Sequence, residues 1–163
     1  MRIIIPGIPI SQARMRHSTF RGFTRTWDPK SQEKKKIRRF LSSFPGSGEF
    51  DYPQISFLFH MPIPKSIRKK DKELFHSGTL KHDKKPDVDN LIKLYLDCLD
   101  GIVIHGDQKV SLGMAVKIYH PEPKTIIWIQ ETPSTLGKQE IAFLDAGELG
   151  KQTFFEMACH CGF

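Results

Sequence analysis

Cysteine is scarce in this sequence, and long apolar runs are absent. The chain has 163 residues but only three cysteines, at positions 98, 159 and 161. An odd number of cysteines argues against the disulfide framework of a small secreted protein and favours a reducing, cytoplasmic compartment. No apolar run approaches the ~20 residues that span a bilayer, and the apolar start of the chain is too short for a signal peptide. The sequence therefore predicts a cytoplasmic protein with no membrane partner.

The composition is that of an ordinary folded protein, but its charge is unevenly distributed. The chain is 39% hydrophobic and 26% charged, with a net charge of +7, and it is long enough for one domain with a core. Residues 1–40 contain 11 Lys and Arg and 2 acids, a net charge of +9, whereas residues 87–131 contain 4 Lys and Arg and 7 acids, a net charge of −3. A basic half collects phosphate through counterion release, and an acidic centre needs metal before phosphate can approach it. This pattern favours a nuclease over a passive DNA-coating protein; the alternative is a solvated basic surface without a nucleic-acid role.

Hydrophobic periodicity predicts both strands and helices. We expect strands over residues 2–10, 54–61, 102–104, 112–119 and 125–130, the first of them an edge strand broken at Pro6-Gly7. Helices are expected over residues 31–42 and from about 89 to about 99. Residues 62–80 form a long polar connection, which indicates function or mobility.

Residues 11–27 mix basic and aromatic side chains without a clear period. They contain Arg14, Arg16, Phe20, Phe23 and Trp27. Two interpretations are equally open: a loop that lies along DNA, or a loop whose aromatic rings cover the core.

Three aspartates surround the second predicted helix. Asp87 and Asp89 precede it, and Asp107 follows it. With Asp89 or Asn90 as the N-cap, the first two straddle a strand-to-helix corner, and residues two apart in extended backbone point to the same side. If the strand over residues 102–104 neighbours this corner, Asp107 completes a cluster of carboxylates suited to a hard cation such as Mg²⁺. The structural alternative for Asp87 and Asp89 is helix capping, which needs only one acid, and the alternative for Asp107 is a plain turn.

Lys93 lies one helical turn after Asp89, on the same face as Asp97 and Asp100. One interpretation is an i, i+4 ion pair worth roughly 0.2–0.5 kcal/mol. The other is a cation held at a metal centre, where it can meet phosphate or protonate a leaving oxygen.

The string Pro86-Asp87-Val88-Asp89-Asn90-Leu91-Ile92-Lys93, followed by Asp97-x-Leu99-x-Gly101, Asp107 and Val110, resembles the core of RusA-type crossover-junction endodeoxyribonucleases. The opening Ile4-Ile5-Pro6-Gly7-Ile8-Pro9 is also similar, so the resemblance covers roughly residues 2–131. It implies an α+β fold, a small mixed β-sheet with helices packed on it, in a single nuclease domain of residues 1–131. Residues 132–163 are then a C-terminal appendage of unknown role.

The same resemblance implies that Asp87, Asp89 and Asp107 bind Mg²⁺, for which Mn²⁺ can substitute, and that Lys93 is the catalytic lysine. Members of this family are homodimers, often encoded by phages or prophages, that resolve four-way DNA junctions and need no organic cofactor. One departure is Gly106, where some members carry a second aspartate beside the last one.

We therefore expect a metal-dependent endonuclease that resolves Holliday junctions by paired nicks. Phosphate contacts are expected from Arg14, Arg16, Lys84 and Lys85. Two alternatives stay open: a DNA-binding module whose acids are structural, and a nuclease that acts on flaps or replication forks.

Overall fold

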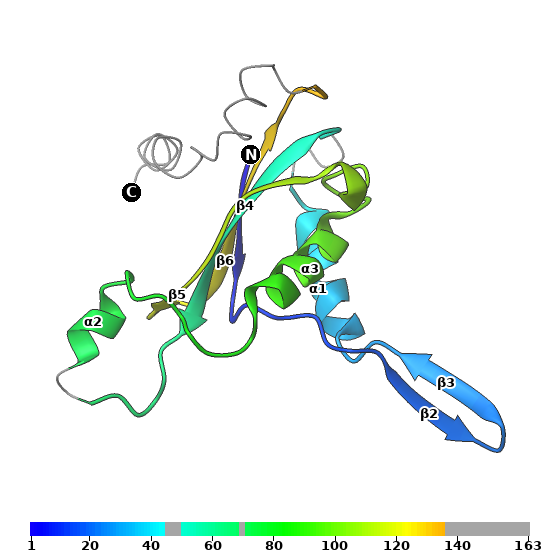
Figure 1. Cartoon of the computed structure of the whole chain (residues 1–163), viewed down its shortest axis with the longest axis horizontal. Coiled ribbons are helices and arrows are strands. Elements are labelled where there is room, and N and C mark those ends of the chain that lie inside the picture. The colour runs from blue at the N-terminus through cyan, green and yellow to red at the C-terminus, as the bar shows by residue number, and fades with distance from the viewer. Residues whose placement is uncertain (45–49, 69–70, 136–163) are drawn as a thin grey trace, which may run out of the picture. The chain divides into compact units, whose positions relative to one another are not determined.

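The computed structural model describes residues 1–44, 50–68 and 71–135, and its elements belong to the unit Met1–Thr132 (Figure 1). The main sheet has four strands in the order β1-β6-β4-β5. Strand β4 runs parallel to β5 and antiparallel to β6, and β6 is antiparallel to β1. The bounds are Arg2–Pro6 for β1, Pro53–Pro62 for β4, Ser111–His120 for β5 and Lys124–Glu131 for β6. A mixed sheet with helices packed on it is an α+β fold, which confirms the predicted class.

Two helices cover one face of this sheet, α1 (Ser31–Leu41) and α3 (Val88–Leu99) (Figure 1). Alternate residues of the central strand point at them, and Ile55, Phe57 and Phe59 are fully buried. The helices contribute a stripe of buried side chains at helical spacing: Ile37, Leu41, Leu91, Leu94, Tyr95, Cys98 and Leu99. Burial of each large apolar side chain contributes about 1.5–3 kcal/mol, so this layer fixes α3 firmly on the sheet.

One predicted strand is wrong. Residues 102–104 form a turn after α3, in which Ile104 makes isolated bridges to Phe50 and Asp100. Val103 and Ile104 are fully buried, so their apolar side chains fill the core beneath the turn rather than extend the sheet. The strands β5 and β6 follow one another in the chain, yet both pair with β4 and lie on opposite sides of it.

Residues 11–27 contain a two-stranded ribbon, β2 (Arg16–Phe20) and β3 (Phe23–Trp27), where the sequence predicts irregular structure. Arg21 and Gly22 connect the strands with φ angles of 48° and 81°. Two-residue hairpin loops need such left-handed residues, and Gly22 adopts this conformation without strain. All ten strand residues are exposed, so the aromatic side chains of the ribbon do not cover the core. The interpretation of this segment as a loop whose aromatic rings cover the core is therefore excluded.

The long connection after β4 contains one short helix, α2 (Lys72–His76), whose Phe75 ring contacts that of Tyr119. Of the described helices, none has the length and apolarity needed to cross a membrane. The predicted appendage of residues 132–163 lies outside the described residues from position 136 onward, and its boundary stays a prediction.

Candidate active site

Helix α3 begins earlier than the sequence predicts, and this changes how the first two aspartates lie. The N-cap is Asp87, in an extended conformation, and Val88 is the first helical residue, whereas Asp89 or Asn90 is the predicted N-cap. Asp89 therefore lies in the first turn, where the positive end of the helix dipole stabilises its negative charge. Asp87 lies outside the helix and Asp89 inside it, so the two-residue spacing does not place both carboxylates on one side as it would in an extended strand.

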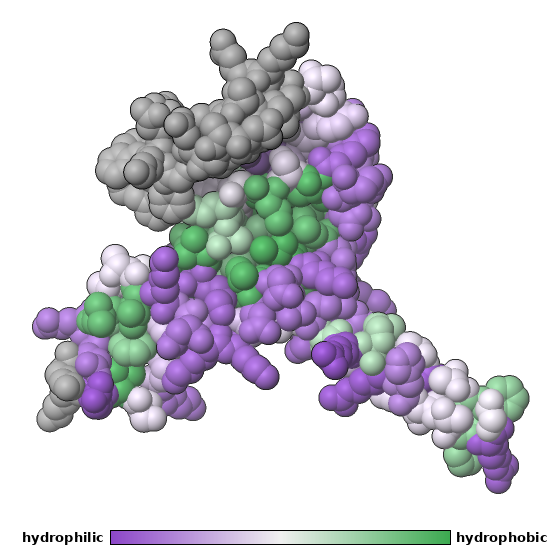
Figure 2. All heavy atoms as spheres, in the orientation of Figure 1, coloured by the Kyte–Doolittle hydropathy of each residue, from purple (hydrophilic) through white to green (hydrophobic). Residues whose placement is uncertain are grey.

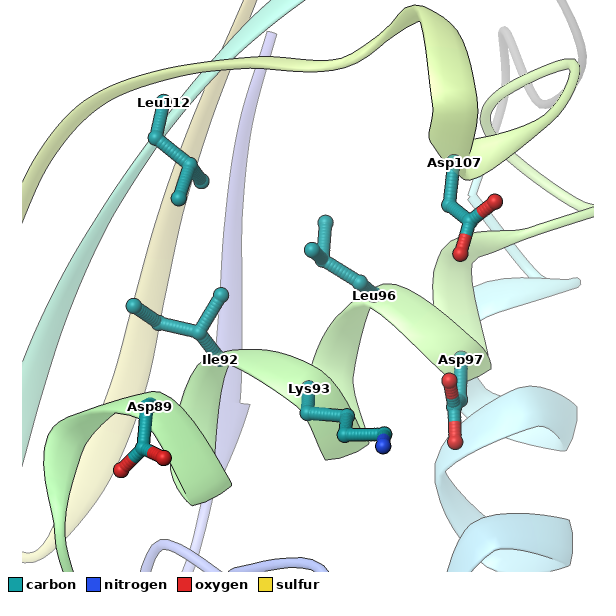
Figure 3. Close-up of a pocket in the computed structure, with 7 residues that line it drawn as sticks. All are labelled: Asp89, Ile92, Lys93, Leu96, Asp97, Asp107 and Leu112. Carbon is teal, nitrogen blue, oxygen red and sulfur yellow. The ribbon is translucent and has the colours of Figure 1, made fainter.

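One face of α3, the turn after it and the start of β5 form a pocket of about 240 Å³ (Figure 3). Asp89, Lys93 and Asp97 follow one another along the helix, and Asp107 faces them from the turn. The remaining lining is aliphatic and consists of Ile92, Leu96 and Leu112. Asp89, Lys93 and Asp107 are all exposed, so the charged groups of this pocket are accessible from solvent.

Asp107 is positioned by the end of α3. It begins a short 3₁₀ helix, Asp107–Lys109, and the preceding Gly106 has a φ angle of 89°. The N–H of Gly106 donates a hydrogen bond of 3.1 Å to Oδ1 of Asp100, the C-cap residue of α3. A second aspartate at position 106 would be strained in this conformation, which accounts for glycine there.

Asp87 lines a second pocket of about 480 Å³, together with Arg14, Lys85, Pro86 and Asn90. Ser11 and Gln12 complete its lining. In the described part of the chain, no three His, Cys, Asp or Glu side chains converge closely enough to enclose a metal ion. The structure thus brings Asp89 and Asp107 to one pocket with Lys93, and it directs Asp87 into the neighbouring pocket.

Lys93 has no ion-pair or hydrogen-bond partner among the described residues. The ion pair with Asp89, one of its two interpretations, is not formed. Its ammonium group lies in the pocket between Asp89 and Asp97 along the helix (Figure 3). An unpaired cation there is available to a negatively charged substrate.

The family model described as Endodeoxyribonuclease RusA matches residues 6–130 of the chain. The chain belongs to the RusA endodeoxyribonuclease family. It is also 30% identical over 136 residues to the uncharacterized protein YqaN of Bacillus subtilis (strain 168), a match that covers 80% of this chain and 96% of YqaN. Membership of the RusA family implies an endonuclease, a hydrolase that acts on DNA.

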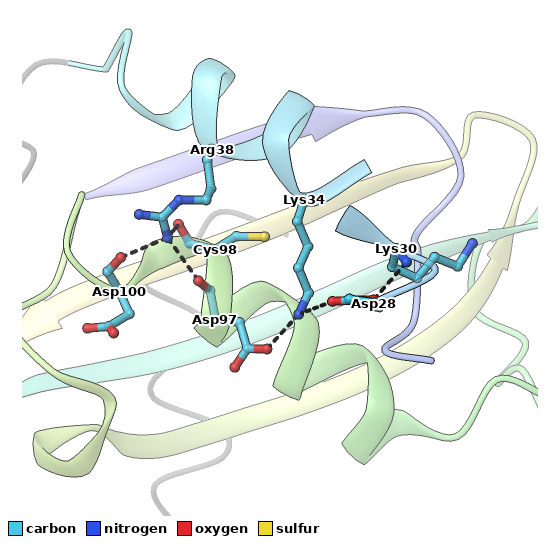
Figure 4. Close-up of polar contacts among 7 residues, drawn as sticks. All are labelled: Asp28, Lys30, Lys34, Arg38, Asp97, Cys98 and Asp100. Carbon is cyan, nitrogen blue, oxygen red and sulfur yellow. Dashed lines mark hydrogen bonds and ion pairs between the residues drawn. The ribbon is translucent and has the colours of Figure 1, made fainter. Parts of the chain in front are cut away.

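In this RusA-family chain, helix α1 holds the carboxylate of Asp97 (Figure 4). Nζ of Lys34 donates to Oδ2 of Asp97 at 2.8 Å and lies 3.1 Å from Oδ2 of Asp28. Burial lowers the pKa of Lys34, but the hydrogen bonds to Asp97 and Asp28 outweigh it, and the pKa is raised above its ordinary value. The helical spacing already places Asp97 on the face of Asp89 and Lys93, whereas its partner lies 63 residues away and has no local signal.

Arg38, one turn further along α1, caps the last turn of α3 (Figure 4). Its Nη1 donates to the backbone carbonyls of Asp97, Cys98 and Asp100 at 3.0, 3.3 and 2.9 Å. These carbonyls have no partner within the helix, and a cation at this end complements the helix dipole. Arg38 therefore fixes the end of α3 from which the Asp107 turn departs.

The four predicted phosphate-binding residues are exposed, and two of them flank a predicted site residue. Arg14 and Lys85 line the pocket of Asp87, whereas Arg16 begins strand β2. Lys84 directly precedes Lys85 on the loop that leads to α3. Lys117, on β5, fixes this loop because its Nζ donates to the carbonyls of Lys84 and Pro86 at 2.9 and 2.7 Å. The sequence gives no signal for this role of Lys117.

The chemistry of the pocket fits a hard divalent cation. Mg²⁺ is usually held by one or two carboxylates, several waters and the phosphates of a substrate, rather than by a closed cage of side chains. Asp89 and Asp107 line one pocket and supply such carboxylates. Asp97 already gives one oxygen to Lys34, which leaves its other oxygen for the pocket.

Proposed function

We propose that this protein is a divalent-metal-dependent DNA endonuclease that resolves four-way junctions by paired nicks. The observation that carries the proposal is the pocket that Asp89, Asp97 and Asp107 line together with Lys93, whose ammonium group has no partner among the described residues. Carboxylates alone repel DNA, so this arrangement needs a bound cation before phosphate can enter. The basic pocket of Arg14 and Lys85 beside it provides the contacts that a phosphate backbone requires.

Asp89 and Asp107 would hold Mg²⁺, or Mn²⁺ in its place, with Asp87, the N-cap residue of α3, as a third carboxylate from the neighbouring pocket. Bound there, the cation supplies Lewis-acid polarisation of the phosphate and lowers the pKa of a water molecule. Lys93 adds a positive charge at the phosphate, where it stabilises charge that develops in the transition state. Arg14 and Lys85 hold the DNA backbone beside Asp87, together with Arg16 and Lys84.

The proposed assembly is a homodimer bound to a four-way junction. Two symmetric nicks need two sites, and a two-fold dimer relates its sites by the same operation that relates opposing strands of the junction. Each chain would contribute one pocket.

The test is cleavage of a synthetic four-way junction beside a linear duplex of matched sequence, each with Mg²⁺, Mn²⁺ or EDTA. We expect paired nicks in the junction with either metal, no cleavage in EDTA, and no activity of an Asp89→Asn preparation purified in parallel. Junction binding without cleavage under every condition would favour the binding-module alternative. Faster cleavage of flaps or forks than of the junction would favour the flap-nuclease alternative.

A further inference from the structure

We infer that the β2–β3 ribbon recognises the branch point of its DNA substrate by stacking the aromatic rings at its tip on exposed bases. This inference rests on the proposed function, because it names the substrate feature that the same protein would recognise. The tip consists of Phe20 and Phe23, which face one another across the two-residue turn. Neither phenylalanine lines the pocket of Asp89 and Asp107 or the pocket of Asp87.

The tip exposes its apolar rings to water. Phe20 is 72% exposed and Phe23 83% exposed, and Figure 2 shows apolar surface at the end of the ribbon beside hydrophilic atoms. The guanidinium of Arg21 lies 5.3 Å from the centre of the Phe20 ring. Two exposed aromatic rings with an arginine are typical of a surface that binds a flat, negatively charged partner.

The charge of the segment indicates which partner this is. Residues 11–27 contain four arginines and neither Asp nor Glu. A polyanion therefore binds the ribbon more readily than a neutral protein surface does. Nucleic acid combines a negative backbone with flat bases, and proteins bind it by pairing basic side chains with aromatic stacking platforms.

The aromatic tip distinguishes a branched substrate from a linear one. In a continuous duplex the faces of the bases are covered by stacking, and opening a step costs a few kcal/mol. At a branch point the stack is interrupted, so base faces are accessible without this cost. The arginines contact phosphate in both substrates, whereas the rings find a partner only at the branch.

The ribbon is ordered internally and anchored close to the proposed site. Oγ1 of Thr19 lies 3.2 Å from Oγ1 of Thr24, and Nδ1 of His17 lies 2.8 Å from Oγ1 of Thr26, so side-chain hydrogen bonds reinforce the strand pairing. Just before the ribbon, the N–H of Gln12 donates to the carbonyl of Asn90, on the first turn of α3, at 2.8 Å. The base of the ribbon therefore lies beside the pocket of Asp87, and binding at the tip can align a phosphate with the site.

The experiment measures equilibrium binding of the full-length protein to a four-way junction and to a linear duplex, in EDTA, so that cleavage does not interfere. A Phe20→Ser/Phe23→Ser double variant is compared with Leu74→Ser, which removes another exposed apolar side chain, 53% exposed, on α2. We expect the double variant to lose junction affinity roughly tenfold or more while duplex affinity is retained. A Phe20→Trp/Phe23→Trp variant should restore the preference for the junction, and Leu74→Ser should leave it unchanged.

A double variant with the wild-type ratio of junction to duplex affinity would overturn the inference. A double variant that changes the oligomeric state in light scattering would also overturn it, because the tip would then be a contact between subunits. Cleavage is assayed separately. If the tip determines junction preference but the wild type cuts no DNA with any metal, the inference stands and the proposed nuclease function fails.

Discussion

The side chains that line the pocket carry opposite charges that do not neutralise one another in the described structure. Within residues 1–44, 50–68 and 71–135, Lys93 forms no ion pair, although carboxylates precede and follow it on the same helix face. Asp97 is held by Lys34 instead. This division leaves Asp89, Asp107 and Lys93 without ion pairs among the described residues and available to a cation and a phosphate. It also gives each residue a separate role that substitution can test.

Asp89→Asn and Asp107→Asn should each abolish cleavage while junction binding is retained or strengthened. The amide keeps the shape of the side chain but removes the charge that holds a cation and repels phosphate. Single-turnover cleavage and binding in EDTA measure the two effects. Asp71→Asn, at the surface end of α2, is the control and should cut normally. If Asp89→Asn cuts as fast as the wild type, the proposed site is wrong.

Lys93→Ala should slow cleavage at saturating protein with nearly normal binding, because one cation contributes little to a long phosphate interface. Lys85→Ala should weaken binding but leave cleavage at saturating protein nearly normal. Each lost phosphate contact should reduce the slope of log K against log salt by about 0.9 on duplex arms. Binding titrations between low and moderate salt measure the slope. A Lys93→Ala protein with wild-type single-turnover rates would mean that the free ammonium group has no chemical role.

At the scale of elements, α1 stabilises the position of α3, and the Arg38 side chain is the main polar link between them. Arg38→Met should lower the free energy of unfolding by about 1–2 kcal/mol, because three backbone carbonyls lose a charged donor. Urea unfolding measures this. Arg39→Met, at the exposed neighbouring position, should change stability by less than about 0.5 kcal/mol. Equal losses from the two substitutions would contradict the proposed capping role.

The elements with a buried face could be predicted from the sequence, and those without one could not. Helices α1 and α3 and strands β4 to β6 agree with prediction to within one or two residues. The helices carry apolar residues at helical spacing, and the strands carry short apolar stretches bounded by polar residues, proline or glycine. The ribbon has no buried face and therefore no such pattern. Its only local signal is Arg21-Gly22 between threonine and phenylalanine pairs.

The candidate site could be predicted in composition but not in geometry. Asp89, Lys93 and Asp97 share a helix face because their spacing dictates it. The separation of Asp87 from Asp89 depends on which residue is the N-cap of α3. Helix propensity does not decide among Asp87, Asp89 and Asn90, because Asp and Asn are both good N-cap residues. The ion pair of Lys34 and Asp97 depends on packing of two helices that are far apart in sequence.

At the scale of the whole molecule, stability should fall as the pH is lowered from 7 to about 4. His60 is buried on β4, and its burial, together with the nearby charges of His120 and Lys124, lowers its pKa from 6.5 to about 4. The unfolded chain binds a proton on this side chain below about pH 6.5, whereas the folded chain does so only below about pH 4. Between these values the unfolded state binds more protons, so acid favours it, by an amount on the order of 2 kcal/mol.

Urea unfolding at pH 7 and pH 5 measures this effect. In a His60→Gln variant the free energy of unfolding should change less between pH 7 and pH 5 than in the wild type. His105→Gln, at an exposed position, should retain the wild-type pH dependence. The lowered pKa of His82, caused first by burial, contributes in the same direction, so part of the pH dependence should remain in this variant. A His60→Gln variant whose stability has the same pH dependence as the wild type would contradict the assignment of this effect to His60.

The symmetry of the substrate leads to the last prediction, that the protein is a homodimer in solution, with about twice the 18.7 kDa mass of one chain. Resolution needs two nicks on opposing strands, and a two-fold dimer presents two copies of the Asp89 and Asp107 pocket in matching orientation. The basic surfaces of the two chains would also join into one field for the junction arms. Wild-type chains co-expressed with excess Asp89→Asn chains should form heterodimers that nick one strand and leave the junction unresolved, which denaturing and native gels distinguish. A monomer in light scattering, both free and bound to a junction, would exclude the paired-nick mechanism and favour a nuclease for flaps or forks, which needs only one cut.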